Sequence, residues 1–243
     1  MALPKIDSPV YEINLPLSKK HIAFRPFLVK EQKNLLMALE ANDLETMNLN
    51  VRQILNNCTL TEGVNIDSLP IIDIEYYFLQ LRAKSVGEIV NAKYRCENIV
   101  EDKKCGNIME SDVDLVKIEV IRDKEIKDII QLNDKISIKL KYPQFKIIKE
   151  VSEIKTDNIA DIALLMMVDS IDCIYDGQQT FYAKDSTREE LIEFMESLNK
   201  FQFDKIQEFF ENLPKLNKTV DIKCSKCGFD HTVQFEGLES FFD

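Results

Sequence analysis

The sequence predicts an α+β fold, in which an N-terminal β-hairpin and helices are followed by a small antiparallel β module and a more helical region. Three observations predict this class. Apolar side chains between residues 30 and 85 recur at helical spacing, whereas from Gly87 onward they alternate with polar ones, as in strands. Two pairs of cysteines also lie between strand-like stretches, which indicates a zinc-ribbon-like module assembled from distant parts of the chain.

The N-terminal part is predicted to be a hairpin followed by three helices. Polar and apolar side chains alternate in residues 10–17 and 21–27, which favours the two strands of a β-hairpin. Leu35, Leu36 and Leu39 are expected on the inner face of the first helix. The three helices are predicted over residues 30–42, 43–58 and 72–85.

The rest of the chain is predicted to mix strands and helices. Alternation predicts strands over residues 88–96 and 112–121. The apolar run 158–175 is typical of a buried helix, and Ser186 with Glu189 fits a capping box at the start of the next helix. Further strands are predicted over residues 134–143, 180–183, 218–224 and 231–237, and further helices over residues 187–199 and 203–213.

These elements divide the chain into three predicted regions. Residues 1–85 form the hairpin and helical region. Residues 86–120 and 216–243 together form the discontinuous zinc-ribbon-like module, because each segment carries one cysteine pair between strands. Residues 121–215 form an α+β region inserted between the two halves of that module.

The composition restricts the partners and the compartment. The chain of 243 residues has a formal net charge of −11, so a polyanion would meet net repulsion, and we expect neither nucleic acid nor a membrane surface as a partner. The longest apolar runs are too short to span a bilayer. The first ten residues lack the pattern of a signal peptide, which predicts a reducing compartment where cysteine pairs bind metal more often than they form disulfides.

Cys96, Cys105, Cys224 and Cys227 are predicted to hold one structural zinc ion. The second pair has the spacing of a zinc knuckle. The second cysteine of each pair is followed by a glycine, which permits the positive φ that such a turn needs. A site with four thiolates has no open position, so the metal would join two hairpins and perform no chemistry.

Two other interpretations of the cysteines stay open. Eight residues separate Cys96 from Cys105, where two to four are usual, so the four cysteines are alternatively reduced and partly buried thiols. His231, four residues after Cys227, is an alternative ligand in place of one of the more distant cysteines.

The sequence contains no recognisable catalytic motif. Its two histidines, His21 and His231, have no partner motif, and a total of six glycines nearly excludes glycine-rich phosphate loops. The two remaining cysteines, Cys58 and Cys173, lie on apolar helix faces, and we expect them to be core residues. We therefore predict no enzymatic activity and no small-molecule substrate.

Several stretches carry a resemblance to a known family: FRPFLVKEQKNLLMALE (residues 24–40), IIDIEYYFLQLRAKSVGE (residues 71–88) and the CSKCG knuckle. An Arg-Pro-Phe segment, a leucine-rich helix, a second helix running into LRAKSVGE and a cysteine-containing ribbon follow one another. In these features the chain resembles the baseplate hub family of T-even-type contractile-tailed bacteriophages over about its first 120 residues. The matching residues are Arg25, Pro26, Phe27, Lys30, Glu31, Lys33, Leu35, Leu36, Asp73, Glu75, Phe78, Arg82, Ser85, Gly87 and Glu88.

The resemblance implies a structural role in a phage tail. It implies a virion protein of the tail baseplate, either a hub subunit or a hub assembly factor, which is assembled in the host cytoplasm and binds other baseplate hub or tail proteins. We expect this contact in the N-terminal region, with Arg25, Phe27 and Arg82 at or beneath the contact surface. The gap between Cys96 and Cys105 is longer than in the family, and this departure affects the predicted metal more than the fold.

Alternatives to this function stay open. The protein is alternatively a dedicated tail-assembly chaperone that is absent from the mature virion, or a zinc-ribbon nucleic-acid binder, against which the net charge argues. The C-terminal segment 235–243, with Phe235, Leu238, Phe241 and Phe242, is a second candidate for partner binding. The other interpretation of this segment is a turn that folds back on its own core.

Overall fold

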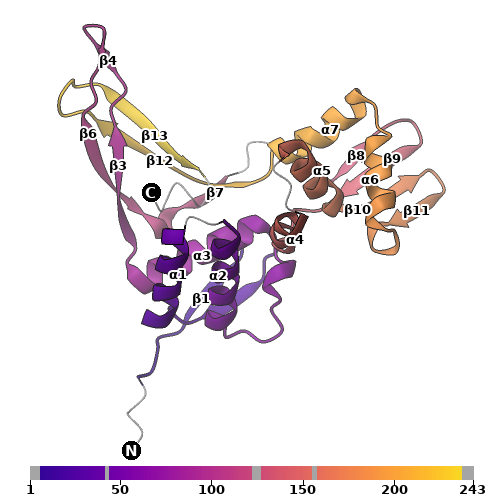
Figure 1. The fold of residues 1–243 in the computed structure, drawn as a ribbon, viewed down its shortest axis with the longest axis horizontal. Coiled ribbons are helices and arrows are strands. Elements are labelled where there is room, and N and C mark those ends of the chain that lie inside the picture. Colours follow the sequence, from indigo (N-terminus) through magenta and orange to yellow (C-terminus); the bar gives the residue numbers. More distant parts are fainter. Residues whose placement is uncertain (1–5, 42–43, 122–126, 155–157, 237–243) are drawn as a thin grey trace, which may run out of the picture.

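The computed structural model describes residues 6–41, 44–121, 127–154 and 158–236 of the chain. It has the predicted α+β class, and its elements form an N-terminal body, a protruding arm and a central body (Figure 1). The arm rises away from both bodies and ends in the small hairpin that carries the label β4. Most of the C-terminal candidate segment 235–243 lies outside the described residues.

The N-terminal body is a hairpin packed against three helices, as predicted. The apolar faces of these elements meet in one core, in which Phe24, Leu55 and Tyr77 are among the largest fully buried side chains. Phe24 and Tyr77 pack edge to face, with their ring centroids 5.4 Å apart. The elements are β1 (Tyr11–Asn14), β2 (His21–Phe24), α1 (Val29–Ala41), α2 (Leu44–Cys58) and α3 (Ile71–Val86).

Helix α1 turns a different face to the core from the one predicted. Glu31 and Leu35 are buried, whereas Leu36 is 52% exposed, so the prediction that Leu36 faces inward is wrong. The leucine pattern misleads because Glu31 takes a position that an apolar residue usually fills. An ion pair with Arg25 and a hydrogen bond from a backbone amide satisfy its carboxylate there. The side chain of Leu39 lies outside the described part of the chain.

Asp73 fixes the β1–β2 hairpin to the start of α3. Its carboxylate is completely buried and accepts hydrogen bonds from the backbone N–H groups of Leu17 and Ser18, both at 2.8 Å. These two residues lie in the turn between the strands, so one side chain satisfies two amides that have no partner within the hairpin ladder. The negative charge also lies in the first turn of α3, where the helix dipole favours it.

The arm consists of two β-hairpins that enclose a thin apolar core. β3 pairs with β6, β12 pairs with β13, and β7 joins β12 at the base of the arm. There the strands pack against Leu79 and Ala83 of α3, and Gln80 donates a hydrogen bond to the carbonyl of Leu115 at 3.2 Å. The strands are β3 (Ile89–Arg95), β4 (Ile99–Val100), β5 (Lys103–Lys104), β6 (Ile108–Asp114), β7 (Glu119–Ile121), β12 (Lys215–Lys223) and β13 (Asp230–Glu236).

The central body combines a four-stranded antiparallel sheet with helices. The strand order is β11-β10-β9-β8, and α5, α6 and α7 share one core with the sheet, which includes Ile138, Met195 and Phe209. Helix α4 contacts both α2 and α5, so it links the two bodies. The elements are β8 (Ile129–Gln131), β9 (Ile136–Leu140), α4 (Lys146–Ile154), α5 (Ile159–Asp169), β10 (Ile171–Asp176), β11 (Gln179–Tyr182), α6 (Arg188–Glu196) and α7 (Lys200–Glu211).

The apolar run 158–175 forms a helix and a strand, and not the single helix that was predicted. Helix α5 ends at Asp169, where the N–H and the hydroxyl of Ser170 both bond to the carbonyl of Met166. A run that is apolar on all sides has no period that separates a buried helix from a buried strand. None of the described helices, α5 included, combines the length and the apolar character that crossing a bilayer demands.

Smaller differences occur at the ends of other elements. The predicted strand 112–121 is interrupted by a 3₁₀ turn at Leu115–Lys117, which the side chain of Asp114 caps by accepting from Val116 N–H. The capping box of α6 is formed one residue later than predicted, by Thr187 and Glu190. Helix α4 and strand β8 were not predicted.

Replacing Asp73 by alanine is expected to lower the free energy of unfolding by about 2–4 kcal/mol, because two backbone amides lose their acceptor. Asp73→Asn keeps one carbonyl oxygen and should cost less than the alanine variant. Urea unfolding followed by circular dichroism measures both. An alanine variant as stable as the parent would show that Asp73 does not anchor the hairpin.

Candidate functional site

Four cysteine sulfurs meet near the far end of the arm. The Sγ atoms of Cys96, Cys105, Cys224 and Cys227 all lie within 4.8 Å of one another, with Cys96 3.6 Å from Cys227 and Cys105 3.9 Å from Cys224. Four sulfurs bound tetrahedrally at 2.3 Å from a zinc ion are about 3.8 Å apart. The cluster therefore has the donor set and the size of a structural zinc site.

A small hairpin takes up the long gap between Cys96 and Cys105. Strands β4 and β5 pair with each other, so the chain returns to the point from which it left (Figure 1). At the base of this hairpin, Cys105 N–H donates to the carbonyl of Asn98 and Cys96 N–H donates to the carbonyl of Asn107, both at 2.8 Å. The eight-residue gap thus brings its two cysteines together as a short knuckle would.

The two glycines that follow the second cysteines have the backbone conformation that was predicted. Gly106 has φ of +66° and Gly228 has φ of +72°. In the second knuckle, Gly228 N–H donates to the carbonyl of Cys224 at 2.9 Å. Residues with a Cβ adopt this left-handed conformation less readily, so glycine favours the tight turn around the sulfurs.

The protein environment shifts the pKa values of Cys224 and Cys96 in opposite directions. The backbone N–H of Cys227, helped by that of Lys226, lowers the pKa of Cys224 to about 6, although burial opposes this shift. Burial raises the pKa of Cys96 to about 12. Cys224 is therefore ready to act as a thiolate ligand near neutral pH, whereas Cys96 needs a neighbouring cation to lose its proton.

His231 lies beside the cluster. Its Nε2 is 3.1 Å from Cys96 Sγ, and its ring contacts those of Tyr94 and Phe229, with centroid distances of 5.3 and 4.8 Å. Among the described residues, the group of possible metal ligands that lie close to one another consists of the four cysteine sulfurs. This accords with a ligand set of four cysteines, with His231 next to it. Cys58 is a core residue, as predicted, and burial raises its pKa to about 11.

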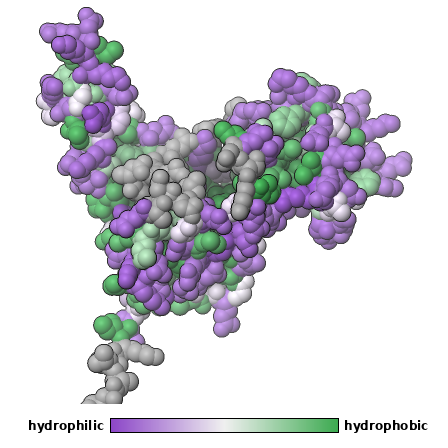
Figure 2. All heavy atoms as spheres, viewed as in Figure 1, coloured by the Kyte–Doolittle hydropathy of each residue, from purple (hydrophilic) through white to green (hydrophobic). Residues whose placement is uncertain are grey.

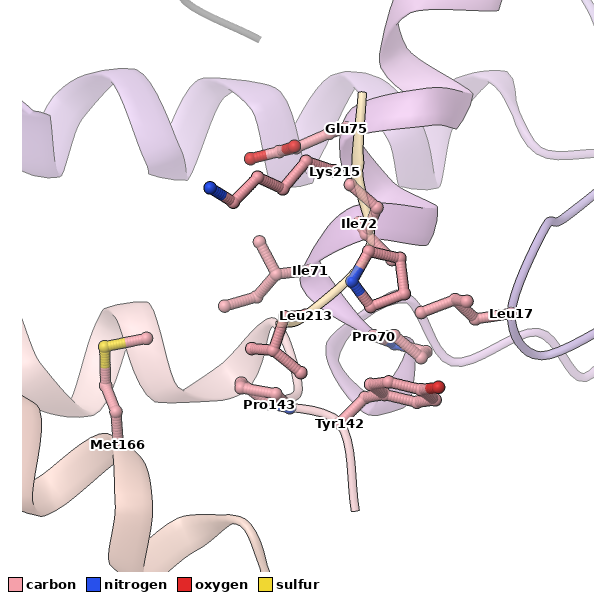
Figure 3. A pocket seen from close by; sticks show the side chains of 11 residues that line it. Leu17, Pro70, Ile71, Ile72, Glu75, Tyr142, Pro143, Met166, Leu213 and Lys215 are labelled. Carbon is pink, nitrogen blue, oxygen red and sulfur yellow. The ribbon is translucent and has the colours of Figure 1, made fainter. Parts of the chain in front are cut away.

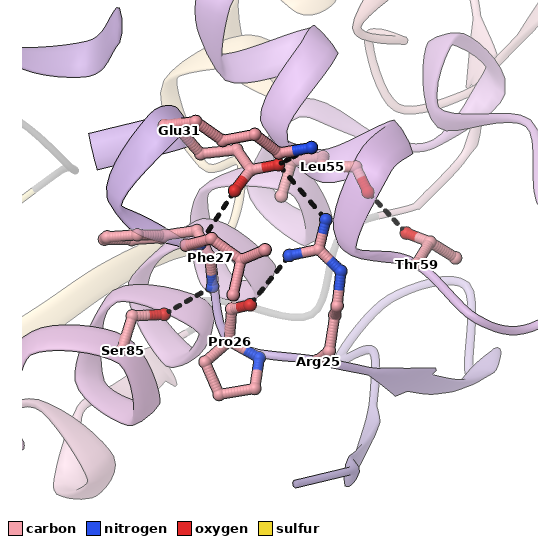
Figure 4. A network of polar contacts seen from close by, with 9 residues as sticks. Arg25, Pro26, Phe27, Glu31, Leu55, Thr59 and Ser85 are labelled. Atoms are coloured by element: carbon pink, nitrogen blue, oxygen red, sulfur yellow. Dashed lines mark hydrogen bonds and ion pairs between the residues drawn. The ribbon is translucent and has the colours of Figure 1, made fainter. Parts of the chain in front are cut away.

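The N-terminal residues expected at or beneath a partner surface lie mostly inside the body. Phe27 is 7% exposed, and its backbone N–H donates to Ser85 Oγ at 3.0 Å. The guanidinium of Arg25 donates to Glu31 Oε1 at 3.1 Å and also to a backbone carbonyl (Figure 4). Arg82 on α3 is half-buried, which lowers the pKa of its guanidinium. These positions suit residues that support a surface.

The outer face of α1, next to this network, carries three exposed apolar side chains. Val29, Leu36 and Met37, at positions i, i+7 and i+8, are 81%, 52% and 59% exposed. Hydrophilic side chains cover most of the visible face of the arm and the central body, with apolar ones between them (Figure 2). Sequence reasoning missed this helix face because it assigned Leu36 to the core.

A hollow of about 460 Å³ lies where the N-terminal body, the central body and the start of β12 meet. Its walls are mainly apolar and include Ile71, Tyr142 and Met166, while Glu75 and Lys215 are its charged side chains (Figure 3). The side chains that line it do not include a nucleophile such as serine or cysteine next to a general base. The hollow suits an apolar side chain better than a reacting substrate.

Acid is expected to destabilise the N-terminal body through Glu31. Its pKa is lowered because the N–H of Leu28 and the guanidinium of Arg25 outweigh the opposing effect of burial. A group whose folded pKa is depressed stabilises the fold above its unfolded pKa of 4.5 and loses that contribution as the pH falls through the folded pKa.

Urea unfolding at pH 7, 5, 4 and 3 measures this contribution. Glu31→Gln should be less stable than the parent at pH 7 and should lose less stability between pH 5 and pH 3. Parallel curves for the two proteins would contradict the assigned role.

A match to one known protein family covers nearly the whole chain. Residues 8–243 match the family described as T4 bacteriophage base plate protein. No curated protein and no solved structure shows significant similarity to the chain. The chain belongs to the T4 bacteriophage base plate protein family.

Proposed function

We propose that this protein is a hub subunit or hub assembly factor of a contractile phage tail baseplate, which acts by protein–protein contact and without catalysis. The observation that carries the proposal is the family match over residues 8–243. The resemblance of residues 24–40 and 71–88 to hub proteins supports the finer assignment. The protein then belongs to the virion tail and is assembled in the host cytoplasm. The net charge of −11 favours protein partners over nucleic acid or a membrane surface.

The partner surface in this proposal is the outer face of α1. Val29, Leu36 and Met37 supply exposed apolar area on one face of the helix, around the exposed Lys33, and apolar helix faces are buried when a helix docks on a partner. Arg25 and Phe27 support this face from the segment just before α1. The Arg25–Glu31 ion pair holds the first turn of α1 on the hairpin. Arg82 has the same supporting role from α3.

The metal in this proposal is one structural zinc ion on the four cysteines. Their sulfur–sulfur distances of 3.6 and 3.9 Å support it. Bound zinc supplies a charge that keeps all four thiols deprotonated and a rigid link between the two hairpins. The chain's own residues determine where that link lies, at the end of the arm opposite α3.

Protein purified without chelator is expected to contain one zinc per chain, and Cys224→Ser is expected to lose it. Without the metal, residues 86–120 should become sensitive to protease, whereas the N-terminal helices should stay protected because their core is separate from the sulfur cluster. Elemental analysis and limited proteolysis measure the two effects.

Cys173→Ala, a buried cysteine outside the cluster, is the control for the zinc content. Well under one equivalent of metal in the parent would rule out the zinc site. A Cys224→Ser variant with the parent's proteolysis pattern would show that the metal does not support the arm.

The double variant Leu36→Glu, Met37→Glu is expected to fold normally. The amount of coexpressed baseplate hub protein that co-purifies with it should fall at least tenfold. Both side chains are exposed, so the charges cost the fold little while they oppose burial against a partner. Ile159→Glu, which changes an apolar residue of the central body that is 81% exposed, should bind like the parent. Equal binding by all three proteins would exclude the α1 surface.

A tail-assembly chaperone that leaves the virion is the remaining candidate, because family membership fits both roles. Mass spectrometry of purified phage particles separates them. A hub subunit is present in a fixed ratio to other baseplate proteins, whereas a departing chaperone is absent from particles and present in assembly intermediates.

A further inference from the structure

Two asparagines occupy equivalent positions beside the cysteine cluster. Asn98 and Asn107 each lie two residues after a cysteine of the first hairpin, in the pattern Cys-x-Asn. Asn98 Nδ2 is 3.6 Å from Cys227 Sγ, and Asn107 Nδ2 is 3.5 Å from Cys224 Sγ. Each asparagine of one hairpin therefore donates a hydrogen bond to a cysteine of the other hairpin.

The backbone holds both asparagines in place. The carbonyl of Asn98 accepts from Cys105 N–H and the carbonyl of Asn107 accepts from Cys96 N–H, both at 2.8 Å. Each asparagine is thus fixed by a cysteine of its own hairpin while its side chain reaches a cysteine of the other. Asn107 Nδ2 also lies 3.2 Å from the hydroxyl of Ser225, inside the second knuckle.

We propose that Asn98 and Asn107 are positioning residues of the metal centre, an inference that rests on the zinc site proposed above. Four thiolates around one Zn²⁺ leave a net charge of −2 in a site with two cysteines nearly inaccessible to water. Neutral N–H donors stabilise that charge without competing for the metal. Because they come from the opposite hairpin, they also align the two cysteine pairs before a metal is bound.

This role explains why the sulfurs of the second knuckle receive donors from two sources. Backbone N–H groups of the knuckle face Cys224 and Cys227 from their own hairpin. The asparagine amides approach the same two sulfurs across the gap between the hairpins. Removing an amide leaves the ligand set intact and weakens only its support, which for donors outside the ligand shell typically costs about 10- to 100-fold in metal affinity.

The test uses the zinc-loaded full-length chain and measures zinc release to an excess of a colorimetric chelator. Asn98→Leu and Asn107→Leu keep the approximate size of the side chain and remove the donor, so each should release zinc about tenfold faster than the parent or more. Asn91→Leu is the matched control, because Asn91 lies on the same arm and bonds to Asp112 instead of to a sulfur. This control should release zinc at the parent's rate.

A second measurement separates support of the metal from general loosening of the arm. With Co²⁺ in the site, the sulfur-to-cobalt charge-transfer band should shift in the Asn98 and Asn107 variants and stay in place in the Asn91 variant. If a leucine variant does not fold, Asn98→Ala and Asn107→Ala, which also remove the donor without adding a charge or a metal ligand, give the same comparison.

Release rates within twofold of the parent and an unchanged cobalt band would overturn the role of the asparagines while leaving the zinc site in place. A parent that holds neither zinc nor cobalt would overturn both. Neither result bears on binding through α1, which the Leu36 and Met37 variants test separately.

Discussion

Closure of the arm by segments far apart in the chain is the constraint on which the rest of the structure depends. At the base, β12 pairs with β7, with Lys215 opposite Ile121. At the far end, Cys105 meets Cys224, 119 positions later. The central body lies between these segments, so its chain leaves and returns at one place. Because the entropy of closing a loop grows only slowly with its length, a whole body fits between the two hairpins at little extra cost.

The two ends of the arm are stabilised by different means. At the base, Leu79 and Ala83 of α3 extend the apolar core of the strands. At the far end the buried residues are few. Met109 packs there in one cluster with Cys96 and Cys224, and two hairpins of this size bury too little apolar area to be stable alone. A structural metal can supply about 10–16 kcal/mol in small zinc domains, so the cysteine cluster lies where the hydrophobic contribution is smallest.

Local patterns predicted the features that depend on neighbouring residues. Alternation located the arm strands, and the Cys-x-x-Cys-Gly spacing located the knuckle with its positive-φ glycine. Features decided by one specific side-chain partner escaped: Glu31 is buried because Arg25, in the segment just before α1, pairs with it. The end of α5 at Ser170 was hidden in a uniformly apolar run. The asparagine donors were also missed, because their acceptor sulfurs lie about 120 positions away.

Helix α3 fixes the positions of the β1–β2 hairpin, the arm and helix α1 relative to one another. Along its length, Asp73 accepts from the β1–β2 turn, Gln80 donates to the first arm segment at Leu115, and Ser85 accepts from Phe27 just before α1. Each contact joins a side chain of one helix to the backbone of a different segment. Apolar packing supplies most of the stability but is not directional, whereas each of these hydrogen bonds has one geometry and is costly to leave unmade. The outer face of α1 and the arm are therefore held at fixed positions on one helix, and a partner bound to α1 would be held in a defined orientation to the cysteine cluster.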